Sequence, residues 1–202
     1  PVVAVAITIT LATPAGERRA AWTAIGWRCP PMRALALALF LPAGLAVASF
    51  GMARVIGIAR FPGLQLTLDG ALTLVVTLAV GCVLALGEEI GWRGFLYPRL
   101  ATLLPRGRAA ILTGIAHAVF HLPLLLLTTA YQSAGKRWIV VPMLMITITA
   151  AGVIYAWLRD YSGGTIWPVA FMHNAFNTFM EMGAGLSVAG SAAALSYATT
   201  ET

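Results

Sequence analysis

The stretch GEEIGWRG (residues 87–94) ends an apolar run, residues 71–86, that contains no charged side chain. Glu88 and Glu89 follow that run directly, and Arg93 comes four residues after the second carboxylate. A charged side chain inside a bilayer is costly to keep, so a function usually explains its presence. If the stretch is helical, Glu89 and Arg93 share a face and can pair, whereas Glu88 is rotated away by about 100°. The spacing therefore lets Glu89 hold the backbone in place by pairing with Arg93, and leaves Glu88 free to take part in chemistry.

The composition is that of an integral membrane protein. Of the 202 residues, 59% are hydrophobic and 10% are charged, and the mean hydropathy is +0.85. A soluble domain carries about 25% charged residues. The apolar runs have the length of a membrane-spanning helix, about 20 residues, rather than the alternating pattern of about 10 residues of a barrel strand. We predict an all-α fold, a polytopic transmembrane helical bundle with about six spans, the first one truncated.

The order of apolar runs and loops predicts where the spans lie. We expect them at residues 1–13, 34–51, 71–92, 109–129, 138–158 and 166–185, separated by loops at 14–33, 60–70, 98–108, 131–137 and 159–164. We expect one transmembrane domain over residues 1–202, with an incomplete N-terminus because the chain starts without Met inside an apolar run. The tail after Leu186 has no assignment.

The basic residues indicate an orientation in the membrane. Of the 13 Lys and Arg residues, nine fall on one side of the predicted spans and four on the other. The richer side is expected to face the cytoplasm, which places Glu88 and Glu89 near that face. Because topology explains the positive charge, no nucleic-acid partner is expected, and membrane lipid is a predicted partner. The Ala- and Arg-rich composition favours a bacterial plasma membrane.

Three predicted spans each carry a polar patch. All three histidines of the chain lie in spans. His117 and His121 have i, i+4 spacing and share a helix face, and His173 and Asn177 have the same spacing on the last span. Because buried polar groups need partners, we expect these two patches to meet the Glu88–Arg93 patch around water or a metal.

Such a cluster suits amide hydrolysis in two ways that the sequence leaves open. A carboxylate can take a proton from water while imidazole and amide N–H groups stabilise the oxyanion. Alternatively, histidines and a carboxylate can ligate a divalent metal such as Zn²⁺. Structural roles also remain open, because His117 and Asn177 can join helices by hydrogen bonds and Glu89 with Arg93 can be a structural pair.

The three patches in this order resemble the motifs of the CPBP family, the CAAX-protease and bacteriocin-processing membrane proteins also called Abi. The matching elements are EExxxR at 88–93, a helix ending in His121, and HxxxN at 173–177, all within residues 71–177. The resemblance implies an intramembrane endopeptidase of the glutamate or metallo type, with a peptide or membrane-protein substrate. It implies that Glu88 activates water, that His121 and His173 position the water or, together with Glu88, bind a metal, and that Asn177 holds the oxyanion.

The resemblance also gives Glu89 and Arg93 supporting parts, and it has one departure. The family's second motif usually has Phe or Trp four residues before its histidine, and here His117 occupies that position, with Phe120 close by. His117 either adds a third imidazole to the site or is a neutral exchange. Two other functions remain as alternatives: a non-catalytic scaffold or immunity protein, and a proton- or metal-coupled transporter, although no internal repeat supports the latter.

Overall fold

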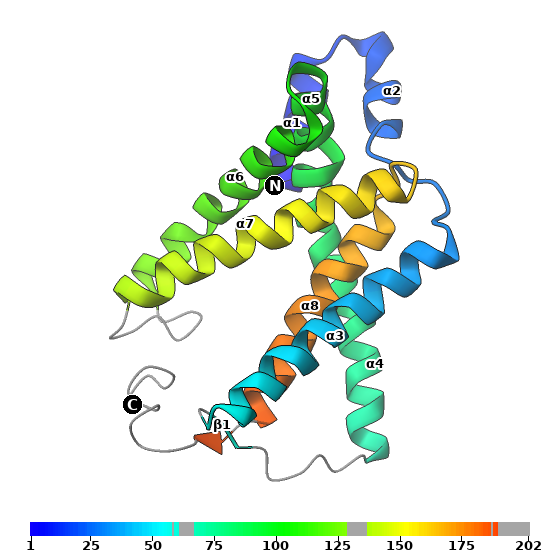
Figure 1. Cartoon of the computed structure of the whole chain (residues 1–202). Helices are drawn as coiled ribbons and strands as arrows, with labels where there is room; N and C mark the ends of the chain where they lie inside the picture. The colour runs from blue at the N-terminus through cyan, green and yellow to red at the C-terminus, as the bar shows by residue number, and fades with distance from the viewer. Residues whose placement is uncertain (58, 61–66, 129–136, 187, 190–202) are drawn as a thin grey trace.

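The computed structural model of the chain is a bundle of long helices (Figure 1). It describes residues 1–57, 59–60, 67–128, 137–186 and 188–189. The long helices are α3 (Met32–Val55), α4 (Leu68–Glu89), α6 (Arg106–Leu127), α7 (Arg137–Tyr161) and α8 (Trp167–Leu186). Helical spans satisfy every backbone polar group internally, which a lipid environment requires. The predicted all-α polytopic bundle is thereby confirmed.

Four helical segments are long and apolar enough to cross a membrane. They are Met32–Val55, Leu68–Leu103, Arg106–Leu127 and Arg137–Tyr161, and a shorter apolar helix covers Val2–Ala12. Within the described residues, this count is lower than the six spans expected from sequence. The helix α8 has the expected length, but it carries polar residues such as His173, Asn174 and Glu181. By its hydropathy α8 is therefore not among the candidate spans, and the span expected at residues 166–185 stays a prediction.

The segment before α3 contains more helix than expected. The first apolar run forms α1 (Val2–Ile7) and the π-helical turn η1 (Thr8–Ala12). The predicted loop 14–33 then includes the 3-10 turn η2 (Ala15–Glu17) and the helix α2 (Arg18–Thr23). No breaker falls between Glu17 and Thr23, whereas Pro30 and Pro31 lie in the non-helical stretch directly before α3, as the sequence indicates.

The predicted basic loop 98–108 is wrong. The chain continues from α4 through a π-helical segment, η3 (Ile90–Leu96), into the helix α5 (Tyr97–Leu103), and α6 begins at Arg106. Pro98 lies in the first turn of α5, where its missing N–H costs little. Only Leu104 and Pro105 separate α5 from α6. Pro98 therefore lies at the beginning of a helix and does not end the helical segment.

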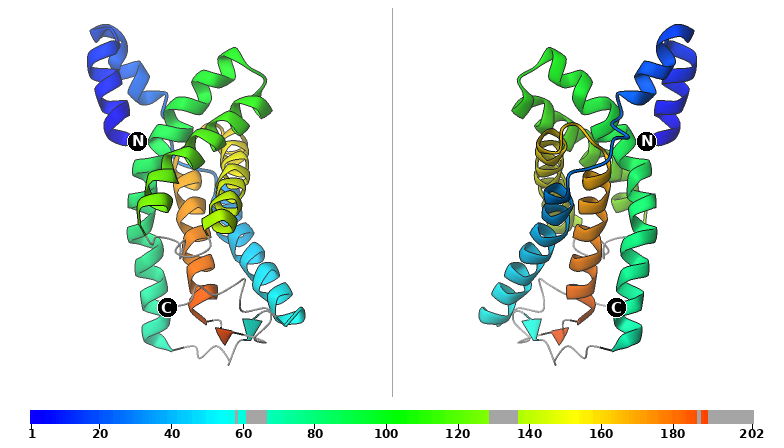
Figure 2. Two further views of the ribbon diagram at one scale, coloured as in Figure 1. Left: turned by 90° about the vertical axis from the view of Figure 1, so that its left-hand side faces the viewer. Right: turned by 90° about the vertical axis from the view of Figure 1, so that its right-hand side faces the viewer.

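The helices pack in two groups that meet near η3. Helices α6 and α7 form an antiparallel hairpin, while α3 and α4 each pack along α8. Figure 1 and Figure 2 show the hairpin crossing the α3–α4–α8 group at an angle. A core cluster joins α3, α7 and α8 through Ala34, Ala38, Tyr155, Leu158, Val169 and Met172. The shared end of the two groups is therefore the place where side chains from several helices converge.

Close contact between α6 and α7 depends on two glycines. A Cβ added to Gly114 would lie 2.7 Å from the backbone oxygen of Thr149, and one added to Gly152 would lie 2.8 Å from the Cα of Gly114. Small residues at helix crossings let backbones approach closely in membranes. This approach brings α6 close enough to α7 for both to line the same site.

The connection between α7 and α8 is shorter than the predicted turn at 159–164, because α7 continues to Tyr161. Gly163 and Gly164 both have positive φ angles, at 75° and 83°, which glycine adopts readily. The backbone N–H of Ile166 then donates to the carbonyl oxygen of Gly26 at 2.9 Å. The turn is thereby joined to the segment ahead of α3. Two short strands, β1 (Ala59–Arg60) and β2 (Val188–Ala189), pair antiparallel at the far end.

Candidate active site

The paired charges Glu89 and Arg93 form the buried base of the site. Nη1 of Arg93 donates to Oε1 and Oε2 of Glu89 at 2.9 and 3.1 Å, and both side chains are 0% exposed. Nδ1 of His173 on α8 lies 2.8 Å from Oε1 of the same carboxylate. Glu89 thus links the end of α4 to both η3 and α8. The i, i+4 spacing predicts its contact with Arg93 but not its contact with His173.

The neighbouring carboxylate, Glu88, faces the opposite helix. Its Oε2 lies 3.0 Å from Nε2 of His117 on α6, and Nδ1 of the same ring lies 3.0 Å from Nη1 of Arg93. The rotation of about 100° between successive helical residues sends Glu88 toward α6 and Glu89 toward α8. Both carboxylates nevertheless end in one network, because Arg93 and His117 connect them.

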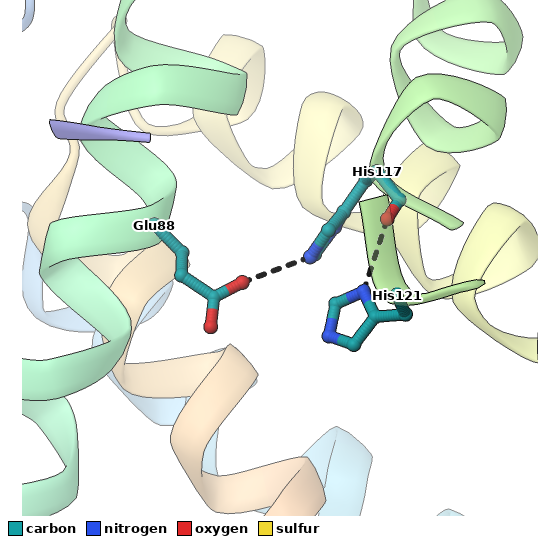
Figure 3. Close-up of side chains that lie close together, drawn as sticks. All are labelled: Glu88, His117 and His121. Carbon is teal, nitrogen blue, oxygen red and sulfur yellow. Dashed lines mark hydrogen bonds and ion pairs between the residues drawn. The ribbon is translucent and has the colours of Figure 1, made fainter. Parts of the chain in front are cut away.

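His121 completes the group on α6. Its Nδ1 lies 3.0 Å from the carbonyl oxygen of His117, one turn earlier, and the two ring centroids are 5.0 Å apart. Figure 3 shows Glu88 pointing across from α4 toward the two imidazoles. The possible ligand atoms of Glu88, His117 and His121 all lie within 4.8 Å of one another. Among the described residues this trio is the set that could hold a metal, and it contains His117 where we predicted His173.

The partners of each imidazole decide which ring nitrogen carries a proton. An arginine only donates, so Nδ1 of His117 must accept from Arg93, and Nε2 of His117 must carry the proton that it donates to Glu88. A carbonyl oxygen only accepts, so Nδ1 of His121 is the donor in its bond to the backbone. Glu89, ionised beside Arg93, likewise accepts from Nδ1 of His173.

These protonation states test whether the trio fits a metal. A metal ligand must be an unprotonated nitrogen, and Nε2 of His117 faces Glu88 with its proton in place. Moving that proton to Nδ1 would set two donors, Nδ1 and Nη1 of Arg93, against each other at 3.0 Å. The trio therefore does not fit a three-ligand metal centre while the Arg93 contact is present, and we derive no catalytic step through a metal.

Asn177 lies outside the network. It follows His173 by one turn of α8, as predicted, but its side chain is exposed and takes no part in the hydrogen bonds described above. The asparagine that joins helices is Asn174, whose Nδ2 donates to the backbone oxygens of Thr77 and Leu78 at 3.2 and 3.0 Å. A Cβ at Gly81 would lie 2.0 Å from Oδ1 of Asn174, so this glycine provides the room.

Aromatic residues that the sequence analysis did not select surround the charged groups. Tyr155 on α7 stacks on His173 with ring centroids 5.4 Å apart, and the guanidinium carbon of Arg93 lies 5.1 Å from the Tyr155 centroid. Trp92 stacks on His117 at 5.0 Å. Trp92 could have been selected as a site residue from the sequence, because it lies directly before Arg93. Tyr155 could not, because it lies in an apolar span without a polar motif.

The guanidinium of Arg93 has more donors than the described residues use. Its Nε and Nη2 are buried and have no hydrogen-bond partner among the described residues. A Cβ added to Gly152 would lie 2.6 Å from Nη2, so the glycine leaves space for the group. Delocalised charge and the Tyr155 ring suit a guanidinium at such a position better than an ammonium.

The residues of the site lie in a region of the chain that matches a known protein family. Residues 70–179 match the family model described as type II CAAX prenyl endopeptidase Rce1-like. This range covers more than half of the 202 residues and includes every residue of the network described above. Neither the curated proteins nor the solved structures yielded a significant match.

Proposed function

This chain belongs to the Rce1-like family of type II CAAX prenyl endopeptidases, and we propose that it hydrolyses a peptide bond in a membrane-associated or peptide substrate. The observation that carries the proposal is the continuous network from Glu88 through His117 and Arg93 to Glu89 and His173. It collects titratable groups from three helices of an integral membrane protein, where each such group is costly to keep.

In this proposal Glu88 is the general base. Its side chain is 32% exposed, whereas that of Glu89 is 0% exposed, so only Glu88 is accessible to a water molecule. Oε2 of Glu88 is held by His117, and Oε1 can take a proton from water. The water oxygen bonds to the scissile carbonyl carbon, the C–N bond breaks, and the proton passes from Glu88 to the leaving amine.

The histidines and Asn177 have complementary parts in the proposal. With its proton on Nδ1, a neutral ring of His173 has a lone pair on Nε2 and can accept the second hydrogen bond of the attacking water, and His121 helps to position that water from the facing helix. The exposed amide of Asn177 can donate to the oxyanion of the tetrahedral intermediate. Glu89 and Arg93 hold the helix end that presents Glu88, which gives a buried ion pair a positioning role rather than a chemical one.

The proposed setting of the reaction rests on the distribution of basic residues and on composition. We propose that the site opens toward the cytoplasm of a bacterial plasma membrane, because the Lys and Arg residues are concentrated on that side. The expected partners are membrane lipid and the peptide or membrane-protein substrate, with no role for nucleic acid. The proposed mechanism is of the glutamate type and uses no step on a metal.

The test uses the full chain in proteoliposomes with internally quenched peptides that end in a CAAX sequence, prenylated and unprenylated. We expect cleavage by the wild type and a loss of at least about 100-fold in kcat in Glu88→Gln. The matched control is Glu181→Gln, the same change at an exposed position on α8, which should keep full activity. A wild type that cleaves none of the peptides, or a fully active Glu88→Gln, would contradict the mechanism.

The same variants address the two other functions. If a biological effect of the protein persists in Glu88→Gln, a scaffold or immunity role replaces the enzymatic one. If the proteoliposomes conduct protons or metal ions and Glu88→Gln abolishes that flux, the protein is a transporter.

A further inference from the structure

The ring of His117 is held at both of its nitrogens. Both of its nitrogens have side-chain partners, Arg93 on Nδ1 and Glu88 on Nε2, each at 3.0 Å. The ring also stacks on Trp92 with an interplanar angle of 26°, and its side chain is only 3% exposed. Few rotations of the imidazole are compatible with these three contacts.

The contacts also fix the chemistry of the ring. Accepting from Arg93 requires a lone pair on Nδ1, so the ring is neutral and its one proton lies on Nε2. A second proton would turn Nδ1 into a donor facing the Arg93 guanidinium and would break that contact. His117 is therefore poorly suited to carry protons during a reaction, and it is equally unable to give an Nε2 lone pair to a metal.

We propose that His117 is a positioning residue that fixes the carboxylate of Glu88 through its Nε2–H. The inference rests on the proposed peptidase function. The order of contacts is Glu89 to Arg93, Arg93 to His117, and His117 to Glu88, so the buried carboxylate sets the direction of the accessible one. Because Oε2 of Glu88 is engaged, Oε1 is the atom presented to water. A charge-assisted hydrogen bond of this kind holds its acceptor firmly.

The first experiment measures the protonation state and needs no activity. The full chain is labelled with ¹⁵N-histidine in lipid bilayers, and the three histidines are assigned through His117→Gln, His121→Gln and His173→Gln. We expect a neutral His117 with its proton on Nε2, and protons on Nδ1 of His121 and His173. A His117 ring that is doubly protonated, or protonated on Nδ1, would overturn the proposal whether or not the protein is a peptidase.

The second experiment separates positioning from packing through three substitutions at one position. His117→Phe keeps a ring against Trp92 and loses both hydrogen bonds. His117→Asn places an acceptor near the position of Nδ1, and His117→Gln places an amide N–H near the position of Nε2. Folding of each variant is checked by its thermal unfolding before the peptide-cleavage assay.

We expect His117→Phe and His117→Asn to lower kcat about tenfold or more, with KM changed less than about twofold. The reason is that only the orientation of the Glu88 carboxylate is lost. His117→Gln should recover most of that loss. Full kcat in His117→Phe would show that the ring only fills space, and an equal loss in all three variants would show that the Nε2–H is not what matters. A Glu88→Gln variant that stays active would count against the proposed function instead, since the ¹⁵N result does not depend on it.

Discussion

Helix α4 has two regions with opposite patterns of burial. Along most of its length large apolar side chains face outward, with Val75, Val80 and Leu84 64%, 57% and 73% exposed. At its end Glu89, and Arg93 in the following η3 segment, are 0% exposed. A soluble protein buries the apolar groups and exposes the charged ones. The inversion shows that lipid covers the long part of α4, and that the polar groups at its end must satisfy one another inside the protein.

The largest expected effect comes from leaving a buried charge without its partner. Arg93→Ala removes the cation beside Glu89, and we expect a loss of about 3–5 kcal/mol in unfolding free energy. The control is Arg106→Ala, which removes another arginine–carboxylate pair, Arg106 with Asp160, whose arginine is 76% exposed. That change should cost less than about 1 kcal/mol.

Unfolding in mixed detergent micelles provides both values for this pair of variants. Equal losses for Arg93→Ala and Arg106→Ala would mean that the buried end of α4 does not differ from the protein surface in the way described. Recovery of stability in Arg93→Met combined with Glu89→Gln would identify the unpaired carboxylate as the cause.

A smaller effect is expected from filling the space beside the guanidinium. In Gly152→Ala the new methyl group would lie 2.6 Å from Nη2 of Arg93 and 2.8 Å from the Cα of Gly114. Overpacking of this kind costs about 1–3 kcal/mol. Gly44→Ala is the matched control, because nothing lies within 4 Å of that added atom in the middle of α3. Its thermal unfolding should be unchanged or slightly higher, since alanine favours a helix over glycine.

The two asparagines of α8 sharpen the comparison further. Asn174→Ala loses two hydrogen bonds to the backbone of α4 and should destabilise the protein by about 1 kcal/mol. Asn177→Ala removes an exposed side chain and should leave stability unchanged while lowering kcat. Measuring unfolding and peptide cleavage on both variants separates the roles. The opposite assignment, with Asn177 needed for stability, would contradict the structure.

The sequence predicted the parts of this molecule that follow from local spacing. Residues four apart, such as Glu89 with Arg93 and His117 with His121, share a helix face whatever the tertiary structure is, and the cost of polar groups in lipid predicted that the patches would meet. The loop predicted to begin at Pro98 is largely helical instead, because a proline ends a helix or begins one depending on its position in the turn. The difference between those positions is not visible in a single sequence.

Other features depend on which helices become neighbours. The stacking of Tyr155 on His173, and the contact of Arg93 with both Glu89 and His117, require α6, α7 and α8 to meet at one end of α4. The spacing to His173 selected Asn177, and Asn174 was not predicted, yet Asn174 is the asparagine that faces the backbone of α4. The rotation of α8 about its own axis decides this, and it is set by packing against Gly81 and its neighbours.

The central claim is that polar side chains from separate helices form one buried site, and a double-mutant cycle between Glu89 and His173 tests it most directly. The two residues are 84 positions apart in sequence, and their side chains are 2.8 Å apart in the structure. We predict that the unfolding free energies of Glu89→Gln, His173→Phe and the double variant give a coupling of about 0.5–2 kcal/mol. Additive losses, with a coupling of zero, would contradict the account.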